Sequence, residues 1–170
     1  ARVTELVHEI AIRHQPNAVG AIGQIDVQPN SRNIIPEKVV FTIDFRSHVL
    51  ETLEAMVMEL NETAPGLCAD VGVSFKSESV GSFDPPAFDP SLVERVRSAA
   101  DRLGYSHMDI VSGAGHDACW ITKTCPTPMV MCPCKDGLSH NEAEEITPDW
   151  ARAGTDVLMH ALLETAEIVD

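Results

Sequence analysis

The sequence has few basic residues: 12 lysines and arginines stand against 26 aspartates and glutamates, which gives a formal net charge of -14. A chain with this excess of negative charge is repelled by nucleic acid and by anionic membrane surfaces. These two classes of partner are therefore excluded on electrostatic grounds. We expect a small molecule or another protein as the partner instead.

The sequence also lacks a run of about 18 apolar residues and a charged-then-apolar leader. Neither membrane insertion nor secretion is expected, and we predict a cytoplasmic protein. Its five cysteines are odd in number and suggest no disulfide framework, which suits a reducing compartment. Cys132-Pro-Cys134 departs from the Cys-x-x-Cys spacing of metal and redox motifs, so structural thiols are the favoured interpretation.

Periodic apolar residues divide the first half of the chain into helices and strands. Helical spacing over 3–11 is followed by strand-like alternation over 18–28, with Ile25 and Val27 on the buried face, and over 39–46. A second helix ends before Pro65-Gly66, and a third strand is expected over 71–75. This order predicts a two-layer α+β sandwich that resembles a ferredoxin-like fold.

Pro85 and Pro86 interrupt this pattern, because two adjacent prolines neither extend a helix nor pair in a central strand. They mark the expected boundary between a domain over 1–85 and a second domain over 86–170. In the second domain, Asp89 caps a helix that ends at Gly104.

The remainder of the second domain alternates between short apolar runs and helical patterns. Buried strands are expected over 108–111 and 128–132, a helix or turn over 116–122, and a last helix that opens at Thr147. Strands that alternate with helices predict a parallel or mixed sheet, and hence an α/β unit.

Two polar residues of the first domain are candidates for binding an anion. The alternation over 39–46 points Val39 and Phe41 inward and places Arg46 on the open face of its strand. Asn33 lies in the loop that leads into this strand, and an amide beside a guanidinium fork could bind a planar carboxylate. A solubilising surface charge is an equally probable interpretation of Arg46.

The second domain contains a glycine-rich turn with a histidine beside it. Gly113, Ala114 and Gly115 are small enough for their backbone amides to approach an anion closely, although a plain tight turn fits the same residues. His116 and Asp117 follow, either as a hydrogen-bonded pair or with Asp117 as an acid near a helix N-terminus.

A second histidine, His140, lies in a polar loop after the expected strand over 128–132. Loops at strand ends are where α/β sheets usually bind ligands. A catalytic zinc site needs about three protein ligands, so one histidine could supply only part of a metal site.

Four motifs together resemble the hydantoinase/carbamoylase family of amidohydrolases, within the larger clan of dinuclear-metal aminoacylases and carboxypeptidases. The motifs are Gly23–Pro36, Phe41-Thr-Ile-Asp-Phe-Arg46, Ser112-Gly-Ala-Gly-His-Asp-Ala118 and Gly137-Leu-Ser-His-Asn141. They occur in the family's order and span nearly the whole chain. The family comprises N-carbamoyl-L-amino-acid hydrolases, β-ureidopropionases and allantoate amidohydrolases.

This resemblance implies a role for each candidate residue. Residues 1–85 would be a lid and homodimerisation domain, and 86–170 the closing segment of an aminopeptidase-like catalytic domain. By motif position, His140 is a metal ligand, Asn33 and Arg46 bind the substrate carboxylate, and the turn over 113–115 lines the same pocket. His116 and Asp117 lie in a signature sequence and are the catalytic candidates.

The resemblance also implies the chemistry: two divalent metal ions, zinc, manganese or cobalt, serve hydrolysis of the ureido bond of N-carbamoyl-L-amino acids. The family's other metal ligands, its catalytic glutamate and a lid histidine are expected to precede this chain. Two alternatives stay open. The chain by itself could act as a non-catalytic dimerisation or binding module, or the whole protein could cleave amides as aminoacylases and dipeptidases do.

Overall fold

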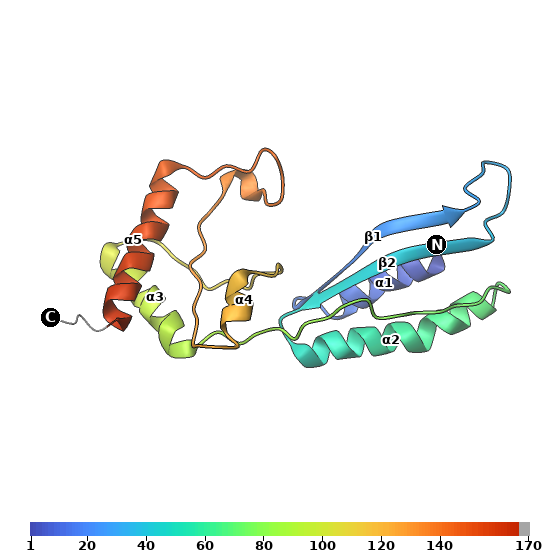
Figure 1. Ribbon diagram of the computed structural model, residues 1–170, viewed down its shortest axis with the longest axis horizontal. Coiled ribbons are helices and arrows are strands. Elements are labelled where there is room, and N and C mark those ends of the chain that lie inside the picture. The colour runs from blue at the N-terminus through green and yellow to red at the C-terminus, as the bar shows by residue number, and fades with distance from the viewer. Residues whose placement is uncertain (167–170) are drawn as a thin grey trace. The chain divides into compact units, whose positions relative to one another are not determined.

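The computed structural model describes residues 1–166. The chain separates into two compact units, Ala1–Pro85 and Pro86–Asp170 (Figure 1). Each unit buries a hydrophobic cluster of its own. The combination of helices with a small sheet confirms the predicted mixed α/β class. Among the described residues, no helix is both long and apolar enough to cross a membrane.

The first unit is an antiparallel pair of strands packed against two helices. Its elements are α1 (Arg2–Arg13), β1 (Ala18–Gln28), β2 (Lys38–Ser47) and α2 (Leu50–Ala69). Ile10 of α1 and Met56 of α2 are fully buried. Phe41, Ile43 and Phe45 of β2 pack against the same cluster. The first predicted helix and the two predicted strands that follow it are therefore confirmed.

A β-bulge in β1 changes which of its side chains face the helices. Between Ile22 and Ile25 the register shifts, so that β1 holds one residue more than β2. The backbone N–H of Gln24, inside the bulge, donates to Thr42 Oγ1 at 3.0 Å and so keeps a partner. Ile22 packs against the core, whereas Ile25 is 55% exposed. The expected burial of Ile25 is wrong: it shares the helix-facing side of the ribbon with its ladder partner Phe41, but it stays exposed at this end.

Val39 is a second exception on the sheet. The sequence predicts that it points inward, but it is exposed near the start of β2. It pairs with Val27, beyond the bulge, whereas the side chains that pack against the core lie from Phe41 onward. The apolar face of the ribbon is therefore covered by helices over only part of its length.

Helix α2 is longer than the sequence predicts, because it continues through Pro65 to Ala69. A proline in a helix interior removes one backbone hydrogen bond. Ala64, just before it, is fully buried, and Leu67, just after it, packs against the core cluster. Apolar contacts on both sides of the proline offset the missing bond.

The predicted third strand over 71–75 is wrong. Gly72, in a left-handed conformation (φ +74°), turns the chain directly after α2, and Val71 and Val73 are exposed. The chain then runs back along α2 (Figure 1), where Ser77 Oγ donates to Asn61 Oδ1 at 2.6 Å. Alternating apolar residues form a strand only beside a neighbour that accepts their backbone bonds.

The second unit is built on two long helices. Its elements are α3 (Pro90–Leu103), α4 (Asp117–Ile121), the 3₁₀ helix η1 (Lys135–Gly137) and α5 (Pro148–Thr165). Asp89 Oδ1 accepts from the backbone N–H of Leu92 at 3.0 Å, and Thr147 Oγ1 accepts from that of Trp150 at 3.2 Å. Gly104 closes α3 with φ +73°. The predicted start and end signals of these helices are confirmed.

The core of the second unit is small and lies between α3 and α5. Its buried members are Ala99, Ala100, Val157 and Ala161. The predicted buried strands over 108–111 and 128–132 are wrong: residues 86–166 contain no strand, and Met108 is 78% exposed. These segments have the composition of strands but find no ladder partner in the described part of this unit.

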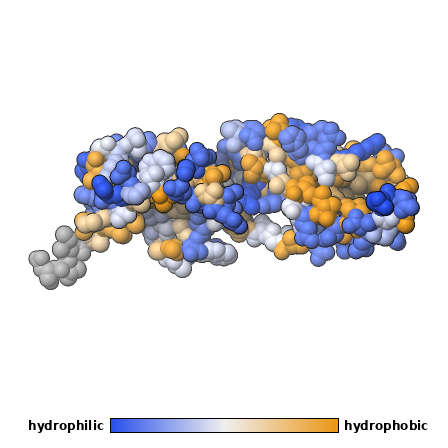
Figure 2. Space-filling view, turned by 90° about the horizontal axis from the view of Figure 1, so that it is seen from above, coloured by the Kyte–Doolittle hydropathy of each residue, from blue (hydrophilic) through white to orange (hydrophobic). Residues whose placement is uncertain are grey.

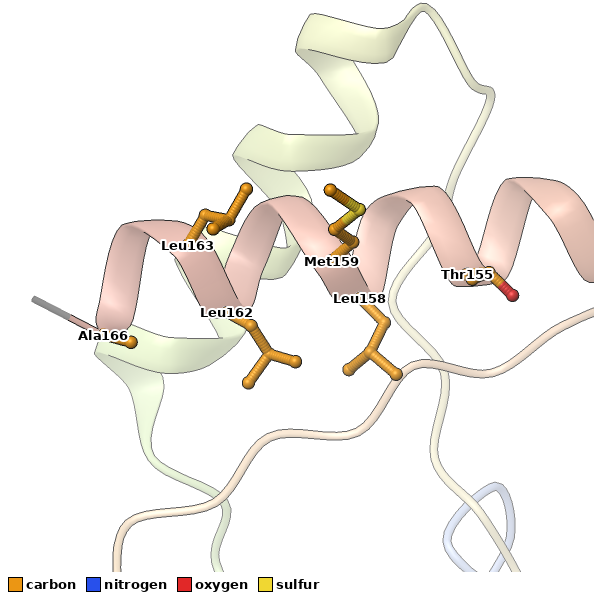
Figure 3. Close-up of a pocket in the computed structure, with 6 residues that line it drawn as sticks. All are labelled: Thr155, Leu158, Met159, Leu162, Leu163 and Ala166. Carbon is orange, nitrogen blue, oxygen red and sulfur yellow. The ribbon is translucent and has the colours of Figure 1, made fainter. Parts of the chain in front are cut away.

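One face of α5 is apolar and open. Figure 3 shows Leu158 and Leu162 projecting from the same side of the helix, where they line a pocket of about 330 Å³. The other lining residues are Thr155, Met159, Leu163 and Ala166. Apolar residues also reach the surface of both units in the view of Figure 2. Among residues 1–166, no ionisable side chain lines the α5 pocket, so these residues do not match a site for a carboxylate or a metal ion.

Cys132 lies close to Gly154 of α5, and this contact gives a test of how the segment around Cys132 packs against the helix. A Cβ added at Gly154 would overlap Cys132 Sγ, closer than two such atoms can approach. Gly154→Ala should therefore lower the free energy of unfolding by about 1–3 kcal/mol, the usual cost of overpacking. Chemical denaturation of the whole protein measures this change.

Two matched variants isolate the cause. Gly66→Ala, in α2, places its Cβ where no atom lies within 4 Å, and should raise the free energy of unfolding by about 0.4–1 kcal/mol. In a Cys132→Ala background the Sγ is gone and the Cβ atom of residue 132 lies 3.9 Å from the added Cβ. Gly154→Ala should then be tolerated, and an undiminished loss of stability would contradict the packing described.

Candidate functional site

Arg46 lies near the end of β2 on the face turned away from the helices, as the sequence predicts. Its side chain is 52% exposed, and its neighbour Phe45 packs against the core. The Nε and Nη2 atoms both donate to Asp44 Oδ2, at 2.9 and 2.6 Å. Hydrogen bonding and charge attraction from Asp44 raise the pKa of Arg46 above its ordinary value. The guanidinium is thus a permanent cation, held by one carboxylate oxygen on a solvent-facing strand.

Asn33 lies in the loop between β1 and β2, where its Oδ1 accepts from Ser31 Oγ at 2.9 Å. The pair Gln28–Lys38 closes this end of the ribbon, whereas Arg46 pairs with Val19 at the other end. Lys38 and Arg46 are eight residue steps apart along the strand, which is about 26 Å. The sequence suggested that the Asn33 amide lies beside the Arg46 guanidinium. Within one copy of the ribbon the two groups are instead far apart.

The glycine-rich turn of the second unit is organised by Ser112. Its Oγ lies 2.7 Å from His116 Nε2 and accepts from the backbone N–H of Ala114 at 3.2 Å. A Cβ added at Gly113 would meet no atom within 4 Å, and Gly113 itself is exposed. The predicted turn over 113–115 thus presents an accessible backbone beside a half-buried histidine.

His116 is the residue before α4, and Asp117 is the first residue of that helix. The imidazole of His116 bonds Ser112 and not the adjacent Asp117 carboxylate. The expectation of a His116–Asp117 pair is therefore replaced by a Ser112–His116 pair. Sequence reasoning overlooked Ser112, although its spacing of four residues from His116 across a turn was the signal available.

His140 lies in a loop that is tied together at its base. The backbone N–H of Lys135 donates to Glu145 O at 2.8 Å, and the two side chains pair at the same distance. His140 has φ +57°, which is uncommon for a residue with a side chain. Its backbone N–H donates to Glu144 Oε2 at 3.0 Å. The loop is therefore a closed structure that holds His140 in an unusual conformation.

The hydroxyl of Ser139 lies 2.8 Å from His140 Nδ1. A hydrogen bond at one ring nitrogen orients a histidine and directs the other nitrogen to a metal, as is usual at metal sites. His140 is exposed and so fits one metal ligand through Nε2. Within residues 1–166, no group of three or more histidine, cysteine, aspartate or glutamate side chains could hold a metal ion. The described residues thus offer one ligand, and not a complete site.

Comparisons with known proteins agree with these features. The profile of the peptidase family M20/M25/M40 matches residues 5–164. An N-carbamoyl-L-amino-acid amidohydrolase of Rhizobium meliloti is 58% identical over 170 residues, which are 100% of this chain and 41% of that protein. A protein of the same name from Paenarthrobacter aurescens is 32% identical over 160 residues, covering 94% of this chain and 38% of the relative.

The chain also resembles solved structures. The crystal structure of an amidase of the hydantoinase/carbamoylase family from Burkholderia multivorans has a TM-score of 0.92 and 47% sequence identity. The match covers 99% of this chain and 41% of that one. The chain therefore spans about two fifths of the length of these relatives.

Proposed function

This chain belongs to peptidase family M20/M25/M40, and its resemblance to the hydantoinase/carbamoylase amidases is confirmed. From this premise we propose that the whole protein hydrolyses the ureido C–N bond of N-carbamoyl-L-amino acids or related ureido acids. The observation that carries the proposal is the 58% identity, over all 170 residues, with a relative named N-carbamoyl-L-amino-acid amidohydrolase. The products would be the amino acid, carbon dioxide and ammonia.

In this proposal the first unit is a lid and dimerisation domain that grips the anionic end of the substrate. Arg46 is exposed, permanently charged and carried on a strand, which fixes its position better than a loop would. Its guanidinium can bind a carboxylate with directed hydrogen bonds. Holding the carboxylate also positions the carbamoyl group for reaction, because a bound substrate no longer has to be oriented during the chemical step.

The second unit would be part of the catalytic domain and supply one metal ligand, His140. Two divalent ions, zinc, manganese or cobalt, would polarise the carbamoyl carbonyl and provide a nucleophile at neutral pH when bound. Ser139 orients His140 for this purpose. The turn over 113–115 lines the pocket, His116 takes part in catalysis, and Asp117 stands at the start of α4 beside them. Other ligands come from parts of the whole protein outside this chain.

The separation of Asn33 from Arg46 extends the proposal to a homodimer. The two residues lie at opposite ends of one ribbon, so they can bind the same carboxylate only where ribbons of two copies meet. A symmetric dimer brings such opposite ends together twice. The partner in solution would be a second copy of the chain, and neither nucleic acid nor a membrane. A cytoplasmic location is proposed as well, since all five cysteines are free thiols.

The substrate class is tested with the purified whole protein after metal loading. We expect turnover of N-carbamoyl-L-amino acids, with the released ammonia measured directly. The rival reaction, cleavage of an amide as in aminoacylases and dipeptidases, is tested with N-acetyl-L-amino acids and dipeptides of the same side chains. Preference for these amides over the carbamoyl compounds would overturn the proposed substrate class.

Carboxylate binding is tested by replacing Arg46. Loss of a hydrogen-bonded charge contact of about 2 kcal/mol should raise KM by roughly 30-fold in Arg46→Ala. Arg46→Lys keeps the charge but loses the forked guanidinium, so its KM should lie between those of the wild type and Arg46→Ala. Arg2→Ala removes an exposed arginine of α1 as the control. An unchanged KM in Arg46→Ala would remove this residue from the site.

The shared site is tested by mixing two variants that are each impaired, Asn33→Ala and Arg46→Ala. If the two residues come from different copies, half of randomly mixed dimers carry one fully intact site. The mixture should then recover about a quarter of the wild-type activity. If both residues of a site came from one copy, mixing would recover nothing, and the dimer arrangement would be rejected.

The metal role is tested by elemental analysis of the whole protein. His140→Ala should lower the bound metal per subunit, because a bond to one ion is lost. His8→Ala, which removes an exposed histidine of α1, is the matched control and should leave the metal content unchanged. Full occupancy in His140→Ala would count against the assignment.

A further inference from the structure

The Ser112 hydroxyl has three polar neighbours but only one proton to give. His116 Nε2 lies 2.7 Å away, and the carbonyl oxygen of Ala114 lies 3.3 Å away. The backbone N–H of Ala114 donates to the hydroxyl oxygen at 3.2 Å, so the oxygen acts as an acceptor there. The single hydroxyl proton can go to the ring nitrogen, or to the carbonyl if Nε2 carries a proton and donates to the hydroxyl oxygen.

The distances favour the ring nitrogen as the acceptor. Hydroxyl donors make hydrogen bonds of about 2.5–3.0 Å, and about 2.7 Å is their commonest length. The contact with His116 Nε2 matches this length, whereas the contact with the Ala114 carbonyl is longer than this range. In the arrangement that these lengths favour, Ser112 donates to Nε2, which is then an unprotonated acceptor in the neutral ring. The proton of the neutral imidazole is left on Nδ1.

Nδ1 of His116 bonds to no residue among 1–166, and the ring is only half-buried. An N–H donor that has no partner among these residues and is partly exposed is available to a ligand. An oxygen atom of a bound small acid, from its carbonyl or its carboxylate, is the acceptor that suits a neutral N–H donor.

We propose that Ser112 is a positioning residue, which holds the imidazole of His116 as its Nδ1–H tautomer and so presents Nδ1–H to an oxygen atom of the substrate. The role of the substrate rests on the proposed function, whereas the tautomer does not. Ser112 is not assigned as a nucleophile, because a serine–histidine nucleophile needs a third group that orients the base. Asp117, the nearest acid in the sequence, does not bond the ring.

The tautomer is read from the ring nitrogen resonances of the whole protein labelled with ¹⁵N-histidine, in which His116 is assigned by its absence from His116→Gln. In the wild type, Nδ1 should carry the proton and Nε2 should resonate as an unprotonated nitrogen. Ser112→Ala should produce a mixture of tautomers, and Ser112→Thr, which keeps the hydroxyl, should restore the wild-type spectrum. An Nε2–H tautomer in the wild type would overturn the proposal without reference to any variant.

Kinetics test the consequence for the substrate. Ser112→Ala should lower kcat/KM for an N-carbamoyl-L-amino acid roughly tenfold, the lower end of the cost of removing a partner that orients a histidine. It should also displace the pH profile, and Ser112→Thr should recover both. Wild-type kcat/KM and pH profile in Ser112→Ala would overturn the role in substrate binding. Absence of ureido hydrolysis by the wild type would instead refute the proposed function, and the spectra would still decide the tautomer.

Discussion

The ladder between β1 and β2 fixes where the anion-binding candidates of the first unit lie. Its register places Arg46 opposite Val19 and leaves Asn33 in the loop beyond Gln28 and Lys38. Because side chains alternate along a strand, the same register that buries Phe45 turns Arg46 toward solvent. The exposed cation is thus a consequence of core packing, and any ligand that needs both candidates must contact two ribbons.

The second unit depends on contacts that its described residues do not supply. Its buried core cluster consists of three alanines and a valine, while Met108, Ile110 and Val111 stay exposed in a segment without regular secondary structure. The outer face of α5 is apolar as well (Figure 3). On a chain that spans about two fifths of its relatives, faces of this kind fit our proposal that other parts of the whole protein pack against this unit. The unit holds candidate site residues but not a complete core.

Local signals in the sequence predicted local structure well. The caps at Asp89 and Thr147 and the left-handed Gly104 act through neighbouring backbone groups, which the sequence alone specifies. The errors concern distant partners: the segments over 71–75, 108–111 and 128–132 have strand composition without a ladder. Apolar periodicity reports that a segment can be buried, and it does not report whether the covering element is present. The bulge at Gln24 escaped notice for the same reason, since Thr42 compensates for it from the other strand.

The site shows the same division between what is local and what is not. The sequence located both histidines in polar turns but not the serine bound to each. Ser139 engages Nδ1 of His140, whereas Ser112 engages Nε2 of His116. Opposite nitrogens are therefore left available: Nε2 at His140, which suits a metal ion, and Nδ1–H at His116, which suits an oxygen acceptor. The serine hydroxyl thus bonds a different ring nitrogen in each histidine, which suits the two histidines of one unit to different tasks. This difference cannot be deduced from the residue types alone.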